Sequence, residues 1–167
     1  MAVTSVLALF GLSSGAHAES AYAGVEYGTF TSEDADMGNL GVNFGVHINK
    51  ILSAEGAYTF SVDKEDVDSD ITLATTSLGV YLAARSEGQF YVKGQLGFAT
   101  VDFDMKGFGV TVSDDTAGLS YGAGVGARFE NVMLELKYIK YPELETFAGL
   151  PVNASNDSIA VSALFSF

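Results

Sequence analysis

The chain has 167 residues, a formal net charge of −13, 48% hydrophobic residues and no cysteine. The length suits one domain with a sizeable core, and the lack of cysteine excludes disulfides and thiolate metal sites. With 8 Lys+Arg against 21 acids, the chain repels phosphate, which excludes a nucleic-acid partner. Beyond the N-terminal segment, apolar runs stay far below the ~18 residues of a membrane-spanning helix, so any crossing of a membrane has to use strands.

The first segment in chain order, residues 1–18, has the pattern of a secretory signal. Residues 2–12 form an apolar stretch, and Ala16-His17-Ala18 is a small-x-small cleavage site before Glu19. No Lys or Arg precedes the apolar stretch, so we expect the true start to lie upstream and the basic n-region to be missing. The alternative is a buried N-terminal strand or helix. The predicted organisation is a signal peptide over 1–18 and one domain over 19–167.

After this segment, apolar residues alternate with polar ones in eight stretches, which predicts eight strands. They cover 21–30, 39–48, 51–60, 71–84, 89–101, 117–129, 132–141 and 157–167. Short turns at 49–50, 85–88 and 130–131 alternate with long loops at 31–38, 61–70, 102–116 and 142–156. An even strand number with short turns at one end and long loops at the other is typical of bacterial outer-membrane barrels. The predicted fold class is therefore all-β: an eight-stranded antiparallel up-and-down transmembrane β-barrel.

A soluble up-and-down barrel such as a lipocalin shares this pattern, and the charged residues separate it from a membrane barrel. A β-sandwich with ordinary core aromatic residues is the alternative for the aromatic pattern. A charge on the lipid face costs several kcal/mol near the bilayer midplane. The predicted inward face carries three acids and three bases, which are Glu26, Glu55, Lys93, Arg128, Glu135 and Lys137. Because an eight-stranded barrel is filled by side chains, we expect these six to form a neutral lumen network. The turn at 130–131 places Arg128 diagonal to Glu135, which predicts an ion pair between them.

The rest of the charge and the aromatic residues agree with this arrangement. The loops at 31–38, 61–70, 102–116 and 142–157 hold 15 acids and 2 bases, a net charge equal to that of the whole chain. Outward aromatic residues are predicted in two girdles, as expected at the headgroup boundaries of a bilayer. The girdle near the short turns contains Phe90, Phe129 and Phe167, and the girdle near the loops contains Tyr27, Tyr58, Phe60, Phe98, Tyr121 and Tyr138.

Several segments resemble a known family when they are taken in order: LSAEGAYTFS (52–61), YVKGQLGFATVDF (91–103), LSYGAGVGARF (119–129), VMLELKYIKY (132–141) and the terminal ALFSF. The chain is similar to the small eight-stranded outer-membrane barrels of the OmpA/OmpX type, also called the porin-like outer-membrane β-barrel domain. The resemblance implies a Gram-negative outer-membrane location with periplasmic termini and extracellular loops. It also implies lumen pairs, best matched by Glu55, Lys93, Arg128 and Glu135.

The resemblance further implies partners. The strand that ends in Phe165 and Phe167 corresponds to the signal that the barrel-assembly machinery reads. Outer-membrane lipid and lipopolysaccharide are the expected surroundings, and a monomer is the expected state.

Candidate catalytic and metal-binding residues are few. His47 is the one histidine after the signal, and its position next to a short turn does not match the lipid A deacylases of this barrel class. A polar lumen residue is therefore the expected role of His47. Asp66, Asp68 and Asp70 are a weak calcium candidate, because their loop lacks the full EF-hand pattern. We expect no enzyme activity and no cofactor.

The sequence thus predicts an outer-membrane barrel with a structural or surface-interaction role, in membrane integrity, adhesion or ligand contact through acidic loops. The alternative is a narrow porin-like channel for small solutes or ions.

Overall fold

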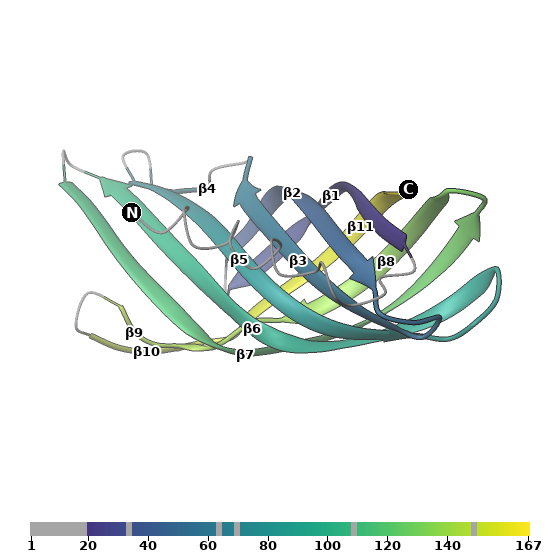
Figure 1. Cartoon of the computed structure of the whole chain (residues 1–167). Coiled ribbons are helices and arrows are strands. Elements are labelled where there is room, and N and C mark those ends of the chain that lie inside the picture. Colours follow the sequence, from purple (N-terminus) through teal and green to yellow (C-terminus); the bar gives the residue numbers. More distant parts are fainter. Residues whose placement is uncertain (1–19, 33–34, 63–64, 69–70, 108–109, 148–149) are drawn as a thin grey trace.

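Eight antiparallel strands close into a barrel in the structure, a computed structural model that describes residues 20–32, 35–62, 65–68, 71–107, 110–147 and 150–167 (Figure 1). Neighbours are hydrogen-bonded in the order β3-β2-β1-β11-β8-β7-β6-β5, and pairing of β3 with β5 closes the ring. The predicted fold class is confirmed. The eight strands are β1 (Ser20–Ser32), β2 (Ala35–His47), β3 (Leu52–Ser61), β5 (Ile71–Arg85), β6 (Phe90–Gly107), β7 (Val110–Phe129), β8 (Val132–Lys140) and β11 (Asn156–Ser166).

Three short strands lie in segments predicted as loops. β4 (Glu65–Asp68) pairs with β5, and β9 (Leu144–Phe147) pairs with β10 (Leu150–Ala154) in a separate hairpin. A search of the described residues for a helix long and apolar enough to cross a membrane finds none.

The prediction of a loop at 102–116 is wrong, because β6 and β7 continue through most of this segment. The pairing of β6 with β7 runs without a register shift from Phe90–Ala127 to Gly107–Val110. The reason is that the alternation of apolar and polar residues also continues. Val101 and Phe103 are buried, whereas Asp102 and Asp104 are exposed on the outer face. The segment was predicted as a loop because it is acidic, although it contains the continuations of β6 and β7.

The two ends of the barrel differ. We call the end with the β2–β3, β5–β6 and β7–β8 connections the turn end, and the opposite end the loop end. Two of these connections have a residue with positive φ, Gly88 at 118° and Glu130 at 50°, which is how so few residues reverse the chain. Ser20 and Phe167 also lie at the turn end, where Ala21 and Phe167 exchange two backbone hydrogen bonds.

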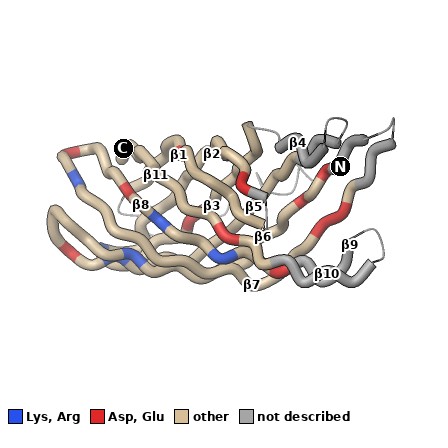
Figure 2. Tube along the Cα trace, turned by 180° about the vertical axis from the view of Figure 1, so that it is seen from behind, with Lys and Arg blue, Asp and Glu red and all other residues tan. Residues whose placement is uncertain are grey.

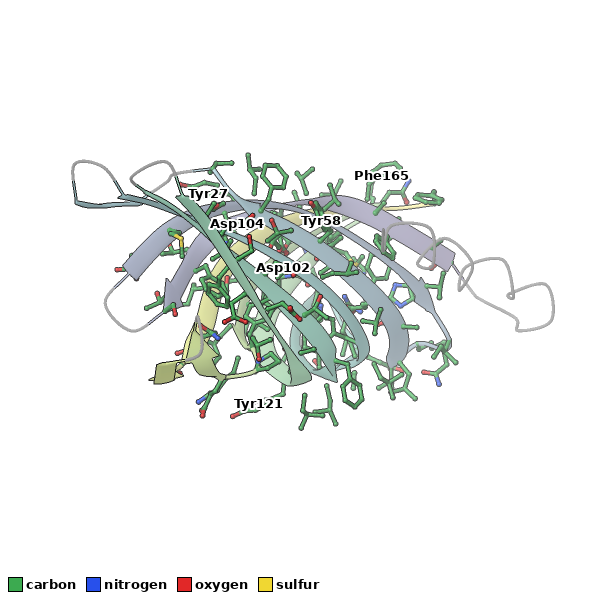
Figure 3. All side chains as sticks on the ribbon, turned by 90° about the vertical axis from the view of Figure 1, so that its left-hand side faces the viewer. Tyr27, Tyr58, Asp102, Asp104, Tyr121 and Phe165 are labelled. Atoms are coloured by element: carbon green, nitrogen blue, oxygen red, sulfur yellow. The ribbon has the colours of Figure 1, made fainter. Side chains whose placement is uncertain are left out.

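The outer face of the barrel wall is apolar. Alternate residues of every barrel strand project away from the lumen, and the exposed ones include Val25, Val42, Leu82, Val92, Leu96, Leu134, Leu136 and Val161. Tyr27, Tyr58 and Tyr121 stand on the outside of the wall in Figure 3. A soluble barrel would bury such residues, so this face fits contact with lipid.

The lumen has two layers of buried side chains. Toward the loop end lies an apolar cluster, the lumen plug, which consists of Phe30, Met37, Ala99, Val101, Phe103, Ile139 and Tyr141. Toward the turn end lie charged and hydroxyl-bearing side chains. Figure 2 shows Lys and Arg within the barrel body, whereas Asp and Glu also occur along the strands that continue to the loop end.

Candidate functional site

Four charged side chains from four strands meet in the lumen and form the site. Glu55 comes from β3, Arg85 from β5, Lys93 from β6 and Glu135 from β8. The Arg85 Nη2 atom lies 2.7 Å from a Glu55 oxygen and 2.9 Å from a Glu135 oxygen. The Lys93 Nζ atom lies 2.6 Å and 3.0 Å from the other oxygens of the same two carboxylates. Each cation therefore bridges both acids, and we call these residues the charge ring.

Hydroxyl groups satisfy further hydrogen bonds of the charge ring. Tyr22 donates to Glu55 over 2.7 Å, and Tyr91 donates to Glu135 over 2.9 Å. Arg85 donates to Ser53 at 2.7 Å and to Tyr22 at 3.1 Å, and its guanidinium lies 5.1 Å from the centre of the Tyr22 ring. Charges buried in a low-dielectric interior need such partners, because an unpaired charge there is strongly destabilising.

A second, smaller polar cluster surrounds Glu26. Lys137 forms an ion pair with Glu26, and Asn43 donates to the same carboxylate over 2.6 Å. Lys137 also donates to the side-chain oxygen of Asn43 at 3.1 Å, and Ser162 reaches Glu26 at 3.4 Å. Glu26 and Lys137 are each 5% exposed, so this pair is as well shielded from water as the charge ring.

The structure places five of the six predicted lumen residues in these two clusters, which are Glu26, Glu55, Lys93, Glu135 and Lys137. Arg128 differs. Its guanidinium lies over the Tyr91 ring, 5.6 Å from the ring centre. The predicted ion pair between Arg128 and Glu135 is therefore wrong, because Arg85 and Lys93 occupy both oxygens of that carboxylate.

Arg85 is a charged lumen residue that was not predicted, because the sequence assigned it to a short turn. It is 2% exposed and ends β5. The signal was present in the sequence: Tyr81, Ala83 and Arg85 are alternate residues, and the first two are also buried. If the predicted strand 71–84 had been extended by one residue, the same alternation would have placed Arg85 in the lumen.

A cavity of about 420 Å³ opens at the turn end, next to Arg128. His47 and Lys50 contribute to its wall together with Glu87 and Glu130. The His47 ring lies 5.0 Å from the Tyr22 ring. The expected role of His47 as a polar lumen residue stays a prediction. The wall mixes bases and acids, so its charge selects neither anions nor cations.

The calcium candidates Asp66, Asp68 and Asp70 have side chains that lie outside the described residues. Among the residues that the structure does describe, no group of three or more His, Cys, Asp or Glu side chains is arranged to hold a metal ion. The calcium site stays a prediction.

Phe165 and Phe167, the predicted assembly signal, both project outward. They are 52% and 72% exposed, and Phe165 is labelled at the outer edge of the barrel in Figure 3. Phe165 lies opposite Ala23 of β1 and opposite Val132 of β8. These rings are therefore free to contact lipid or a protein, while the backbone of the same strand closes the barrel.

With the barrel and its lumen described, comparison with known proteins identifies the class. Residues 4–167 match the model of the outer membrane protein beta-barrel domain family. The chain belongs to this family, which confirms the resemblance seen in the sequence and places the protein in the bacterial outer membrane. No relative is found among curated protein sequences.

Solved structures show the same fold at low identity. Neisserial surface protein A is 15% identical with a TM-score of 0.70, covering 89% of this chain and 96% of that one. The N-terminal β-barrel domain of Pseudomonas aeruginosa OprF is 12% identical with a TM-score of 0.65, covering 87% and 97%. Ail, the attachment invasion locus protein of Yersinia pestis, is 14% identical with a TM-score of 0.61, covering 89% and 97%, and was also solved with the heparin analogue sucrose octasulfate.

Proposed function

We propose that this barrel has a structural or surface-interaction role in the outer membrane, with the turn end and both termini in the periplasm and the loop end outside the cell. The observation that carries the proposal is the filled lumen. A barrel that is closed by its own side chains contributes to the membrane through its outer face and its loops.

Two layers fill the lumen. In the charge ring, Arg85, Lys93 and Glu135 are 2%, 5% and 3% exposed. In the lumen plug, Phe30, Met37 and Val101 are 1%, 0% and 0% exposed. An eight-stranded barrel has an interior just wide enough for side chains, and the apolar plug offers a passing ion no hydrogen-bonding partner. This argues against the alternative role as a channel.

Conductance of the purified barrel in a planar bilayer tests this role. We expect only rare, brief openings, because both layers have to move before ions pass. A Phe30→Ala, Met37→Ala double variant, which opens the plug but keeps the charge ring, is the positive control and is expected to conduct more than the wild type. Large and steady openings of the wild type would overturn the proposal in favour of a porin-like channel.

The orientation can be tested because the chain has no cysteine. A single cysteine at Glu143 marks the loop end, and one at Glu87 marks the turn end. We expect a membrane-impermeant maleimide to label the Glu143→Cys variant in whole cells and the Glu87→Cys variant only after the cells are broken. The reverse pattern would refute the orientation.

The charge of the loop end supports a basic partner. Asp36, Asp102, Asp104 and Asp115 are exposed there, and the chain carries −13 overall. A polyanion such as the sulfated sugar bound by Ail would be repelled by this field. We infer that contacts through the loop end are made with cationic groups. Enzyme activity forms no part of the proposal, because the described lumen acids Glu26, Glu55 and Glu135 are taken up in ion pairs.

A further inference from the structure

The cavity of about 420 Å³ at the turn end is lined by charged residues from all three connections of that end. Lys50 belongs to the β2–β3 connection, Glu87 to the β5–β6 connection and Glu130 to the β7–β8 connection. Arg128, near the end of β7, is the fourth charged residue of the wall. Figure 2 shows both kinds of charge at this end of the barrel, where the C-terminus also lies. Two bases and two acids thus share one cavity, whose size is typical of small-molecule sites.

These four charged residues do not pair with one another. None of them forms an ion pair with a described residue, whereas the three lumen carboxylates are all paired. The half-buried Arg128 guanidinium lies over the Tyr91 ring and donates no hydrogen bond to any described residue. A guanidinium that is partly withdrawn from water usually finds a carboxylate or another acceptor. This unpaired cation in the cavity wall is the feature that points to a ligand.

Hydrogen bonds hold the backbone around the cavity in place. The Asn49 side chain accepts two backbone N–H groups of its own connection, each over 2.8 Å, which fixes the turn that bears Lys50. The Arg128 N–H donates to the Gln89 backbone oxygen over 2.8 Å, which ties β7 to the connection that bears Glu87. A site whose backbone is already ordered loses less entropy when a ligand binds.

The cavity is separate from the charge ring. Met133 contributes to the cavity wall, is 1% exposed, and packs with Tyr22 and Leu164 in a buried apolar cluster. Tyr22 in turn donates its hydroxyl to Glu55 of the charge ring. A ligand can therefore occupy the cavity and contact Met133 without displacing an ion pair of the charge ring.

The mixture of charges defines the kind of ligand that fits. An anion that suits Arg128 and Lys50 would be repelled by Glu87 and Glu130, and a cation would meet the reverse. A molecule that carries both an anionic group and an ammonium group meets each pair of charges favourably. The planar guanidinium suits the two oxygens of a carboxylate or phosphate.

We propose that the turn-end cavity binds a small zwitterion. Its carboxylate or phosphate group lies against Arg128 and Lys50, and its ammonium group lies against Glu87 and Glu130. Free amino acids, short peptides and the phosphoethanolamine headgroup of lipids share this chemistry. The location of the site in the periplasm rests on the proposed function, whereas the binding itself does not depend on the orientation of the barrel.

Calorimetric titration of the folded barrel in an uncharged detergent tests the proposal with two probes. Alanyl-alanine represents amino acids and peptides, and glycerophosphoethanolamine represents the lipid headgroup. We expect saturable binding of at least one probe, and the probe that binds more tightly identifies the source of the ligand. The absence of saturable binding of both probes would overturn the proposal.

Probes with a single charge test the need for both groups. N-acetyl-alanyl-alanine lacks the ammonium group, and alanyl-alanine amide lacks the carboxylate. Glycerol phosphate and ethanolamine are the corresponding halves of the lipid headgroup. We expect each to bind at least roughly tenfold more weakly than the parent zwitterion, as for the loss of a charge-assisted hydrogen bond. A half that binds as tightly as its parent would contradict a zwitterion site.

Matched variants test the residues. Arg128→Met removes the unpaired guanidinium, and the barrel is expected to fold because the charge ring does not use Arg128. Lys140→Met removes a base at the loop end and is the control. We expect the Arg128→Met variant to bind the zwitterion at least roughly tenfold more weakly, and the Lys140→Met variant to stay within about twofold of the wild type. Equal affinities of the two variants would contradict the assignment of the site.

Replacement of the two acids gives a readout that loss of structure cannot imitate. In a Glu87→Gln, Glu130→Gln double variant, we expect weaker binding of the zwitterion but tighter binding of the probe half that carries only the anionic group, because the repulsion is removed. Weaker binding of both would assign the effect to a changed cavity and would overturn the roles of the acids.

Failure of this inference can be distinguished from failure of the proposed function. The calorimetric titrations report on the turn-end cavity alone, whereas the conductance and labelling experiments report on the lumen and the orientation.

Discussion

The guanidinium of Arg85, at the end of β5, lies 2.9 Å from the carboxylate of Glu135 on β8, on the other side of the barrel lumen. The same guanidinium also contacts Glu55 on β3. Arg85 thus links β5 to its neighbour β3 and to β8, which is not a neighbour of β5 in the sheet. Such cross-lumen contacts complement the hydrogen-bonded wall, because they fix the spacing of opposite strands.

Replacement of Arg85 tests the charge ring. Arg85→Met is expected to lower the free energy of unfolding by about 3–5 kcal/mol, since Lys93 alone then faces two buried carboxylates. The measurement is the urea midpoint of the folded barrel in lipid vesicles. Arg128→Met is the matched control, because Arg128 contacts an aromatic ring at the turn end, and its effect is expected to stay below about 1 kcal/mol. Equal effects of the two variants would show that the charge ring is hydrated.

Two glycines offer a test of packing inside and outside the wall. A Cβ atom on Gly45 would lie 2.3 Å from the Tyr22 ring, whereas one on Gly94 would meet nothing within 4 Å. Gly45→Ala is expected to displace Tyr22 from Glu55 and to cost about 1–3 kcal/mol of stability. Gly94→Ala is expected to leave stability unchanged or raise it by about 0.5–1 kcal/mol. Thermal unfolding, followed by the gel shift between folded and unfolded barrel, measures both, and a destabilised Gly94→Ala would refute the assignment of inner and outer faces.

The terminal aromatic residue is expected to matter more for assembly than for stability. Deletion of Phe167 removes an exposed ring and the backbone bonds to Ala21 at the end of the β1–β11 pairing. We expect much less folded barrel in the outer membrane of cells, but a nearly unchanged urea midpoint once the variant is refolded in lipid. Phe129→Ala, which removes another exposed ring at the turn end, is the control. A similar loss of assembly in both would indicate a general need for aromatic residues.

The extension of β6 and β7 is expected to depend on pH. Partial desolvation of the carboxylate against the strand pair, and then the neighbouring carboxylates of Asp115 and Asp104, raise the pKa of the exposed Asp102. A carboxyl with a raised pKa in the folded state binds its proton more readily there than in the unfolded chain. The extension therefore gains stability as the pH falls through the raised pKa and loses it as the pH rises. Hydrogen exchange of residues 101–107, corrected for intrinsic rates, measures this change.

The matched variant for this prediction is Asp102→Asn. It removes the titrating group and keeps the size and the outward direction of the side chain. We expect its exchange rates to vary less with pH than those of the wild type, and to show stronger protection near neutral pH. Unchanged pH dependence in the variant would assign the effect to another group.

The sequence by itself determined the barrel, because alternation has a period of two and one face of every strand had to suit lipid. It placed Glu55, Lys93 and Glu135 inside for the same reason, and it placed the outward stripe that ends in Phe167. These are properties of single strands and their turns, which local pattern and elementary energetics decide.

The tertiary structure decided which charges meet. Lumen contacts join residues far apart in the chain, such as Arg85 and Glu135, and depend on the stagger of strands around the closed barrel. A diagonal neighbour such as Arg128 is close along the wall, yet its long side chain extends to the turn end, and a cation from the other side of the lumen takes the carboxylate. The sequence also did not predict that β7 extends past the end of its neighbour β8, because this depends on the unequal lengths of the two paired strands.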